Sequence, residues 1–159
     1  MSANSYMTPF IKATIKVCKE MLDLTVSSAH SENEGDSFLS RGFIVIVGFT
    51  GGWRGRFFLD MPHSTAIKLA QILTGEEYQS VNEEEVLLCG AEIGNIISGN
   101  AITDVNNTQS GFNIRLTPPS VFAGEDVSLF NVHLSSWSVL MQTEVGEIKI
   151  NVAVEEANK

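Results

Sequence analysis

Apolar residues recur at intervals of three and four in several segments of the chain, and this spacing predicts amphipathic helices. The first helix begins at Thr8 and Pro9, which supply an N-cap and a proline at the first helical position. Its apolar positions are Met7, Ile11, Ile15, Cys18 and Leu22. A second helix, residues 63–75, has Ser64 as a possible cap and stops at Gly75. Its apolar positions are Ala66, Leu69, Ala70 and Leu73.

Two segments between these helices have the composition and alternation of β-strands. Residues 42–49 are dense in β-branched and aromatic side chains, and residues 53–61 alternate, with one side formed by Trp53, Phe57 and Leu59. Gly51 and Gly52 between them predict a hairpin turn. A phosphate-binding loop at these glycines is disfavoured, because neither a Lys-Ser/Thr pair nor a helix start follows.

The C-terminal third is predicted to be mostly strand. Residues 112–116 alternate, residues 117–126 interrupt the pattern with two prolines and a glycine, and residues 128–134 form a possible strand. Residues 137–155 predict a strand, a turn near Val145-Gly146 and a returning strand. The apolar side of the returning strand consists of Ile148, Ile150, Val152 and Val154.

The order of these elements predicts the fold class. Residues 27–37 contain one apolar residue, so we expect a solvated loop there. Helices that alternate with hairpins favour an α+β fold, in which long helices pack on an antiparallel sheet. With 159 residues, of which 43% are hydrophobic, the chain is expected to form one domain over residues 1–159.

Charge and cysteine content narrow the class of partner. A net charge of -9 argues against nucleic acid and against an anionic membrane, and favours a partner with a basic patch. Cys18 and Cys89 lack metal-binding spacing, so buried reduced thiols and a cytoplasmic protein are expected. We find no signal-like N-terminus and expect no apolar stretch of about 18 residues that would span a bilayer. The scattered histidines receive no ligand role; they are His30, His63 and His133.

A third predicted helix, within residues 82–101, carries the candidate chemistry. Asn82 and Glu85 resemble a capping box at its start. An advance of 100° per residue gathers one half of the helix for burial on the sheet: Val86, Cys89, Ile93, Ile96, Ile97 and Asn100. The polar misfit there, Asn100, is expected near the end of the helix. The opposite half forms one longitudinal stripe of Leu88, Glu92, Asn95 and Gly99.

The stripe has two interpretations that the residues leave open with equal weight. Exposed helix faces commonly carry Glu and Asn, so the stripe is explained by solvation alone. Two features favour a function instead. Asn95 is unfavourable within a helix because its amide competes for backbone hydrogen bonds, and Leu88 and Gly99 occupy positions where solubility would favour Lys or Glu.

Glu92 and Asn95 together suit one kind of reaction. A carboxylate is repelled by a phosphoryl group, so Glu92 is a poor base for phosphate chemistry and a better anchor for a partner's lysine. The Asn95 carboxamide both donates and accepts hydrogen bonds, so it can hold a water in line with an electrophile. This is sufficient for an activated substrate such as an acyl phosphate.

At these residues the sequence resembles the CheC/CheX/FliY phosphatases, which dephosphorylate the chemotaxis response regulator CheY. The family signature is an acidic or Ser residue, three residues, Glu, two residues, Asn, 22 residues and Pro. Glu92 and Asn95 match, and residues 96–117 give the 22-residue gap before Pro118. The flanks "MTPFIKAT", "LTPPSVFAGE" and "TEVGEIKINVAV" are also similar. Because one Glu/Asn helix is present, the resemblance is to the single-site CheX.

The resemblance implies a function that agrees with the chemistry of the stripe. The partner would be a phosphorylated CheY-like receiver domain, with Glu92 paired to a receiver lysine and Asn95 orienting the attacking water. The chain would need no cofactor of its own, because the Mg²⁺ belongs to the response regulator. A homodimer formed through strands is expected by analogy. The first signature position is Leu88, neither acidic nor Ser. This departure favours one alternative, a non-catalytic module that binds the phosphorylated receiver. A purely structural dimeric adaptor is a third, weaker alternative.

Overall fold

The computed structural model describes residues 3–35, 37–130 and 135–156, and the side chains of residues 6–27, 37–130 and 136–155. Three helices and nine strands lie in these parts of the chain. Their order is α1 (Ala3–Leu22), β1 (Ser27–Gly35), β2 (Ser37–Leu39), β3 (Phe43–Thr50), β4 (Trp53–Met61), α2 (His63–Thr74), α3 (Glu84–Thr108), β5 (Arg115–Leu116), β6 (Ser120–Ala123), β7 (Ser128–Phe130), β8 (Ser135–Thr143) and β9 (Gly146–Glu156).

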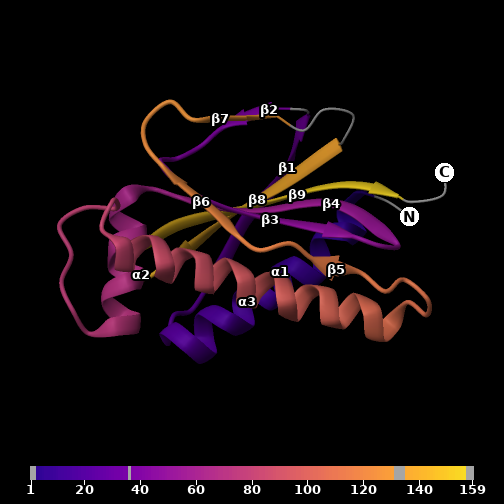
Figure 1. Cartoon of the computed structure of the whole chain (residues 1–159), viewed down its shortest axis with the longest axis horizontal. Helices are drawn as coiled ribbons and strands as arrows, with labels where there is room; N and C mark the ends of the chain where they lie inside the picture. Colours follow the sequence, from indigo (N-terminus) through magenta and orange to yellow (C-terminus); the bar gives the residue numbers. More distant parts are fainter. Residues whose placement is uncertain (1–2, 36, 131–134, 157–159) are drawn as a thin grey trace.

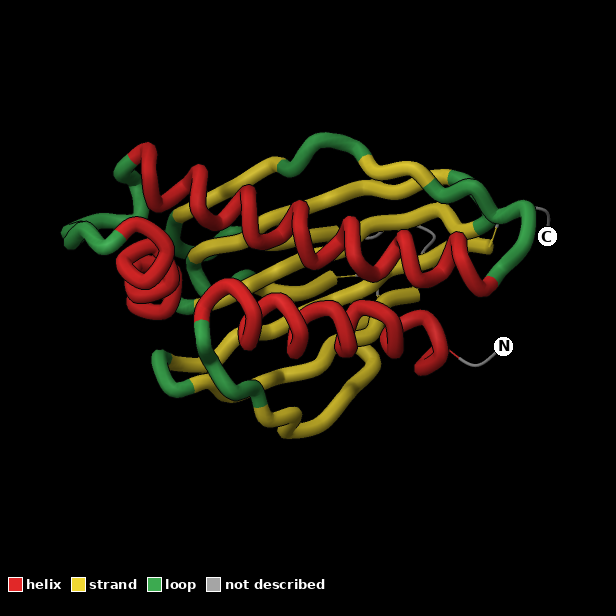
Figure 2. The backbone as a smooth tube through the Cα atoms, turned by 90° about the horizontal axis from the view of Figure 1, so that it is seen from below, coloured by secondary structure: helices red, strands yellow, loops and turns green. Residues whose placement is uncertain are grey.

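The elements form three layers around a seven-stranded sheet. Its strands run in the order β1-β8-β9-β4-β3-β5, with β6 also paired to β3, and every pairing is antiparallel. The three helices cover one face, and the small sheet of β2 and β7 lies on the other (Figure 1). Figure 2 shows α1 and α3 side by side across the sheet. The predicted α+β class, with long helices on an antiparallel sheet, is confirmed.

Strand alternation produces two hydrophobic clusters, one on each face. On β3, Val45 and its alternate neighbours face the helices, whereas Ile44 faces the small sheet. On β4, the predicted side with Phe57 belongs to the main core, and Phe58 lies in the second cluster. That cluster consists of Phe38, Ile44, Phe58, Leu129 and Ala153. The small sheet therefore shields an apolar surface that the helices leave uncovered.

The first helix differs from its prediction at the start and on its buried face. It begins at Ala3, so Pro9 lies inside it. Met7, Cys18 and Leu22 are buried as predicted, whereas Ile15 is 41% exposed. Phe10, Ala13 and Val17 complete the core side of the helix. Phe10 stacks on Phe57 with ring centroids 5.1 Å apart. Proline is common at the first helical position but does not always mark it, which explains the error at the start. The stacking of Phe10 determines which side of the helix faces the sheet.

The predicted loop at residues 27–37 is wrong, because β1 and β2 occupy most of it. β1 pairs with β8 at the edge of the sheet. Main-chain hydrogen bonds form this pairing, so polar side chains do not prevent it, and they are usual on edge strands. The interruption predicted at residues 117–126 also contains a strand, because β6 pairs with β3 over four residues directly after Pro118 and Pro119.

The other strand predictions hold in part. The hairpin turn at Gly51 and Gly52 is confirmed, as are β8, β9 and the apolar side of β9. The predicted strand 112–116 shrinks to Arg115–Leu116, because Asn113 has a φ of 48°. Within the predicted strand 128–134, β7 covers Ser128–Phe130, and residues 131–134, with His133, lie outside the described residues, as does the side chain of His30.

The predicted N-caps of α2 and α3 are wrong as well. α2 follows Pro62 with no side-chain cap, although it ends at Gly75 as predicted. At α3 the N-cap is Glu83, also without a side-chain cap bond. Its carboxylate accepts hydrogen bonds from the backbone N–H groups of Gln79 and Ser80, at 2.7 and 3.0 Å. Glu85 instead accepts a hydrogen bond from the Tyr78 hydroxyl, so it is not available for a capping box.

Among the helices of the described residues, α3 alone is long and apolar enough to cross a membrane, with a mean hydropathy of 1.3. The expectation that no stretch has this length and composition is therefore wrong. In the structure, 44% of the apolar window is buried inside the protein. A helix in the core of a protein can have the same length and hydropathy as a membrane-spanning helix. One side of α3 packs against β3 as part of the core.

Candidate functional site

The predicted stripe of Leu88, Glu92, Asn95 and Gly99, called here the α3 stripe, lies on the solvent side of α3. Leu88 is 59% exposed, Glu92 and Asn95 are exposed, and Gly99 is half-buried. The buried side of α3 consists of Val86, Gly90, Ile93, Gly94, Ile97, Ser98, Ala101, Ile102 and Val105. The helix wheel thus predicted the orientation of the stripe correctly.

Two glycines hold α3 in this orientation. A Cβ atom added to Gly90 would stand 2.4 Å from the Phe43 ring, and one added to Gly94 would stand 2.6 Å from Cγ1 of Val45. Real Cβ atoms essentially never come so close, so the helix backbone packs directly on β3. Hydrophobic periodicity does not detect glycines, and these two were missed as buried positions.

Three residues that were assigned to the buried half are only half-buried: Cys89, Ile96 and Asn100. Asn100 does not end the helix, which continues to Thr108. Its side-chain amide donates a 2.9 Å hydrogen bond to the Ile96 carbonyl, which satisfies this polar group within the helix. Burial, with the charges of Glu85 and Glu92, raises the pKa of the Cys89 thiol. The thiol therefore stays protonated and is not an activated nucleophile.

Glu92 and Asn95 lie one helical turn apart, and their side chains are unpaired. Neither forms a hydrogen bond or ion pair with any residue that the structure describes. A helix places them about 60° apart around its axis, so both face the same solvent region. The surface thus presents a carboxylate and a carboxamide whose hydrogen-bonding capacity is available to another molecule.

Asn95 also borders a groove of about 550 Å³ between α3 and α1. Its lining contains Lys16 from α1 and several amide and hydroxyl groups from α3. The residues are Lys16, Asn95, Ile96, Gly99, Asn100, Thr103, Asp104 and Asn107. Sequence patterns did not indicate this groove, because it depends on how two helices distant in the chain are placed side by side (Figure 2).

Pro118, the last residue of the predicted signature, is exposed between β5 and β6. The 22 residues before it comprise the rest of α3, the return of the chain and β5. Thr117 accepts a 2.9 Å hydrogen bond from the Gly48 N–H, which ties this segment to β3. The spacing from Asn95 to Pro118 therefore spans a complete helix-to-sheet return.

Other chemical groups lie elsewhere in the parts of the chain that the structure describes. Within the described parts of the chain, no three His, Cys, Asp or Glu side chains are grouped as metal ligands. His63 contacts the Gly42 carbonyl through Nε2 at 2.9 Å, a contact that ties α2 to the start of β3. The α3 stripe and its groove therefore remain the candidate site.

Comparison with known structures supports the fold. The chain aligns with the chemotaxis protein CheX from Desulfovibrio desulfuricans at a TM-score of 0.84 and 20% identity, over 95% of this chain and 99% of that one. CheX from Vibrio vulnificus gives 0.83 and 22%, again over 95% and 99%. CheX from Borrelia burgdorferi, in a complex with CheY, BeF3 and Mg, gives 0.69 and 31%, over 95% and 98%.

Comparison of sequences identifies the family. No curated protein matches the chain. The family model for the chemotaxis phosphatase CheX matches residues 43–144, a segment that runs from the start of β3 through α2 and α3 to the end of β8. This segment is more than half of the chain and includes all four residues of the α3 stripe. The chain therefore belongs to the CheX family.

Proposed function

We propose that the chain is a phosphatase that accelerates hydrolysis of the phospho-aspartate of a CheY-like response regulator. The observation that carries the proposal is the pair of unpaired side chains, Glu92 and Asn95, on the outward side of α3 in a CheX-family chain. The Borrelia burgdorferi relative, with 31% identity, was solved with CheY, BeF3 and Mg. Such a partner suits an acidic chain whose site contributes a carboxylate and an amide.

In this proposal Asn95 positions the attacking water. The amide oxygen accepts a hydrogen bond from the water, and the amide NH2 donates one to the water oxygen or to a phosphoryl oxygen. The water oxygen attacks phosphorus, the bond from phosphorus to the aspartyl oxygen breaks, and the products are the receiver's free carboxylate and inorganic phosphate. A neutral amide suits this step because it adds no negative charge beside the phosphoryl oxygens. The Mg²⁺ would be held by the receiver.

Glu92 serves docking in this proposal, not proton transfer. It lies about one helical turn, or roughly 4.5 Å of helix rise, from Asn95. An ion pair between Glu92 and a receiver lysine would therefore set the depth at which Asn95 enters the phosphorylated pocket. Leu88 and Gly99 extend the contact along the α3 stripe, the first through apolar area and the second by allowing close approach.

Leu88 supports one alternative function. It stands at the first signature position and exposes 59% of its surface, so this position offers the partner no polar group. A chain that binds the phosphorylated receiver without accelerating its decay is the alternative. Both functions use the same surface, and they differ in whether the bound receiver loses its phosphate faster.

A decay assay separates the two functions. Candidate receivers are phosphorylated with acetyl phosphate. Loss of their phosphate is then followed with and without the chain at saturating concentration. The phosphatase proposal expects faster decay for at least one receiver. A receiver that binds tightly yet decays at its own rate would establish the binding module instead, and screening many receivers also identifies the cognate partner.

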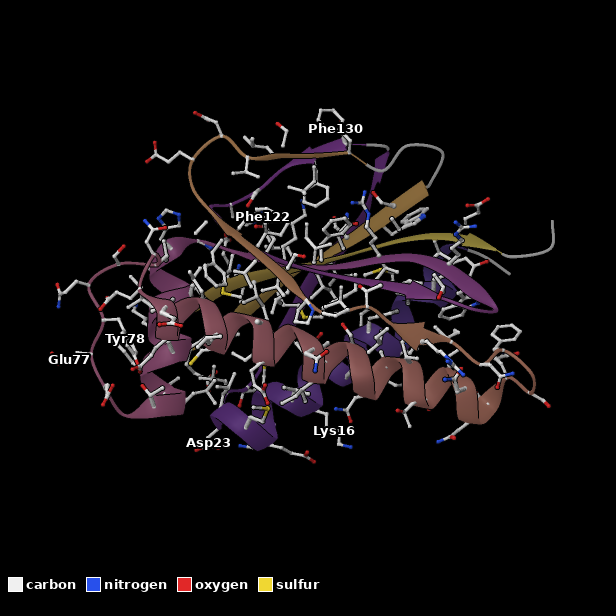
Figure 3. The ribbon with its side chains drawn as sticks, in the orientation of Figure 1. Lys16, Asp23, Glu77, Tyr78, Phe122 and Phe130 are labelled. Atoms are coloured by element: carbon white, nitrogen blue, oxygen red, sulfur yellow. The ribbon has the colours of Figure 1, made fainter. Side chains whose placement is uncertain are left out.

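We further propose that the protein forms a homodimer and works in the cytoplasm. Leu39, Phe122 and Phe130 are 59%, 50% and 63% exposed. Figure 3 places Phe122 and Phe130 away from the helices. A second copy bound there would bury these side chains and leave the α3 stripe open. Sedimentation of the Phe122→Ser and Phe130→Ser proteins tests the dimer.

The proposed cytoplasmic location rests on the cysteines. Both are free thiols, which suits a reducing compartment.

A further inference from the structure

The two helices that flank the groove have opposite charge. α1 carries three lysines and one glutamate, a net charge of +2, in a chain whose total is -9. α3 carries Glu84, Glu85, Glu92 and Asp104 and no lysine or arginine, a net charge of -4. The surface made by these two helices is therefore polarised, with its positive side on α1.

Two lysines of α1 lie along this boundary, and Lys16 shares the groove with Asn95. Lys12 and Lys16 also line a hollow of about 240 Å³ that continues toward Pro9. Neither lysine forms a hydrogen bond or ion pair with any described residue, including Asp104, the acid that borders both hollows. Figure 3 shows Lys16 on the helix side of the molecule.

Asn95 consequently has an anion beside it and shares its groove with a cation. Glu92 is one turn from Asn95 on α3 but is not part of the groove, whereas Lys16 lines the groove together with Asn95 and also borders Asn100 and Asp104. Phosphorylation replaces an aspartate carboxylate of charge -1 with an acyl phosphate of charge about -2, so the receiver gains about one negative charge, placed on the phosphoryl oxygens. A receiver that pairs its lysine with Glu92 and brings its phosphoryl group to Asn95 would present this new negative charge to the Lys16 side.

We propose that Lys16 is a specificity-determining residue that makes the site prefer a phosphorylated receiver over the same receiver without phosphate. This inference rests on the proposed function, because it takes the receiver as the partner. Lys12, one turn away, adds a second positive charge beside the groove, against the single negative charge of Asp104. The polarity also excludes the reversed orientation of the receiver, in which its lysine would meet Lys16 and its phosphoryl group would meet Glu92.

The test compares two lysine variants of α1 that lose the same charge. Lys16→Ala removes the cation from the groove. Lys19→Ala is the control, because Lys19 borders neither hollow and pairs with Asp23 at 3.1 Å. Lys16→Arg keeps the charge. The probe is a receiver identified by the decay assay, measured with and without BeF3 and Mg²⁺ as the phosphoryl mimic, at low and high salt.

We expect Lys16→Ala to reduce the preference for the BeF3-loaded receiver by about three- to fivefold at low salt, with a smaller effect at high salt. Lys16→Arg should retain the preference, and Lys19→Ala should match the unchanged protein. In the decay assay Lys16→Ala should raise the concentration for half-maximal acceleration more than it lowers the maximal rate.

Two results overturn the inference, and they differ in what else they overturn. In the first, the unchanged protein prefers the loaded receiver, and Lys16→Ala has the same preference as Lys19→Ala. This result overturns the role of Lys16 and leaves the proposed function intact. An unchanged protein that neither binds receivers nor accelerates their decay overturns both.

Discussion

The backbone of Gly94 lies against Val45 so closely that a Cβ at this glycine would stand 2.6 Å from Cγ1 of the valine. This contact presses the middle of α3 onto β3, the strand next to the sheet edge formed by β5 and β6. The following residue, Asn95, is turned by about 100° and leaves the contact for solvent. The packing of a glycine thus sets the direction of the amide to which we assign the chemistry.

Gly94→Ala should destabilise the protein, whereas Gly99→Ala should not. The added methyl at position 94 meets Val45, and overpacking of this kind costs about 1–3 kcal/mol. At Gly99 nothing lies within 4 Å of the added atom, so alanine should stabilise the helix by about 0.5–1 kcal/mol. Denaturant unfolding measures both. Equal effects of the two changes would show that α3 does not rest on its glycines.

Gly99→Ala also tests the partner surface, because the change is harmless to the fold. If the receiver approaches the α3 stripe closely at Gly99, the methyl should weaken binding although stability rises. Titration of the receiver mimic against both proteins measures this effect. Unaltered affinity would remove Gly99 from the docking surface.

Leu88→Ala should weaken receiver binding by about three- to tenfold, because an exposed leucine buried by a partner loses much of its apolar area. The free energy of unfolding should change by less than about 0.5 kcal/mol, since Leu88 is outside the core. The matched control is Ile72→Ala on α2, a 39% exposed apolar residue away from the α3 stripe. Equal binding by all three proteins would contradict a docking role for Leu88.

Glu92→Lys should reduce receiver affinity by about tenfold or more, because it replaces attraction to a lysine by repulsion. Glu84→Lys is the matched control, with the same charge change on the first turn of the same helix. The difference between the two should shrink as salt is added. If both substitutions weaken binding alike, the effect comes from overall charge and no ion pair at Glu92 is supported.

Asp60 is a buried carboxyl away from the site, and its burial predicts that the stability of the protein depends on pH. Burial raises the pKa of this carboxyl to about 6, although Ser40 and the Arg41 N–H donate hydrogen bonds to it. Between the unfolded pKa, near 4, and 6, the native state binds the extra proton. Stability contributed by Asp60 should therefore rise, by up to about 3 kcal/mol, as the pH falls from 7 to 4.

Asp60→Asn provides the reference for this titration, because asparagine does not ionise in the range. Unfolding free energies of both proteins are measured from pH 7 to 4, and their difference isolates Asp60 from the other carboxylates. A difference that is independent of pH would mean that Asp60 has an ordinary pKa in the folded protein.

Hydrophobic periodicity predicted the parts of the fold in which side chains decide the structure. Alternation identified β3, β4, β8 and β9, whose inward residues form the core. It missed β1, because an edge strand gains its pairing from main-chain hydrogen bonds and can carry polar residues. It missed β6, because this strand has only four residues and directly follows two prolines. The helix caps were wrong because short-range patterns do not show which partners the loops provide, such as Tyr78 for Glu85.

The site could be predicted only as far as it belongs to one helix. Glu92 and Asn95 were located by the periodicity of α3 alone, even though the glycines that orient this helix left no hydrophobic signal. The groove, and with it Lys16, depends on the packing of α1 beside α3. Such neighbours are tertiary, and spacing within one segment does not reveal them.

The central claim is that the Asn95 amide orients the water that releases phosphate from a receiver. The most direct measurement is the decay of a phosphorylated receiver in the presence of saturating Asn95→Ala protein, with binding measured in parallel. We predict that the variant still binds the receiver mimic and that decay falls back to the receiver's own rate. Decay accelerated as strongly by Asn95→Ala as by the unchanged protein would contradict the claim.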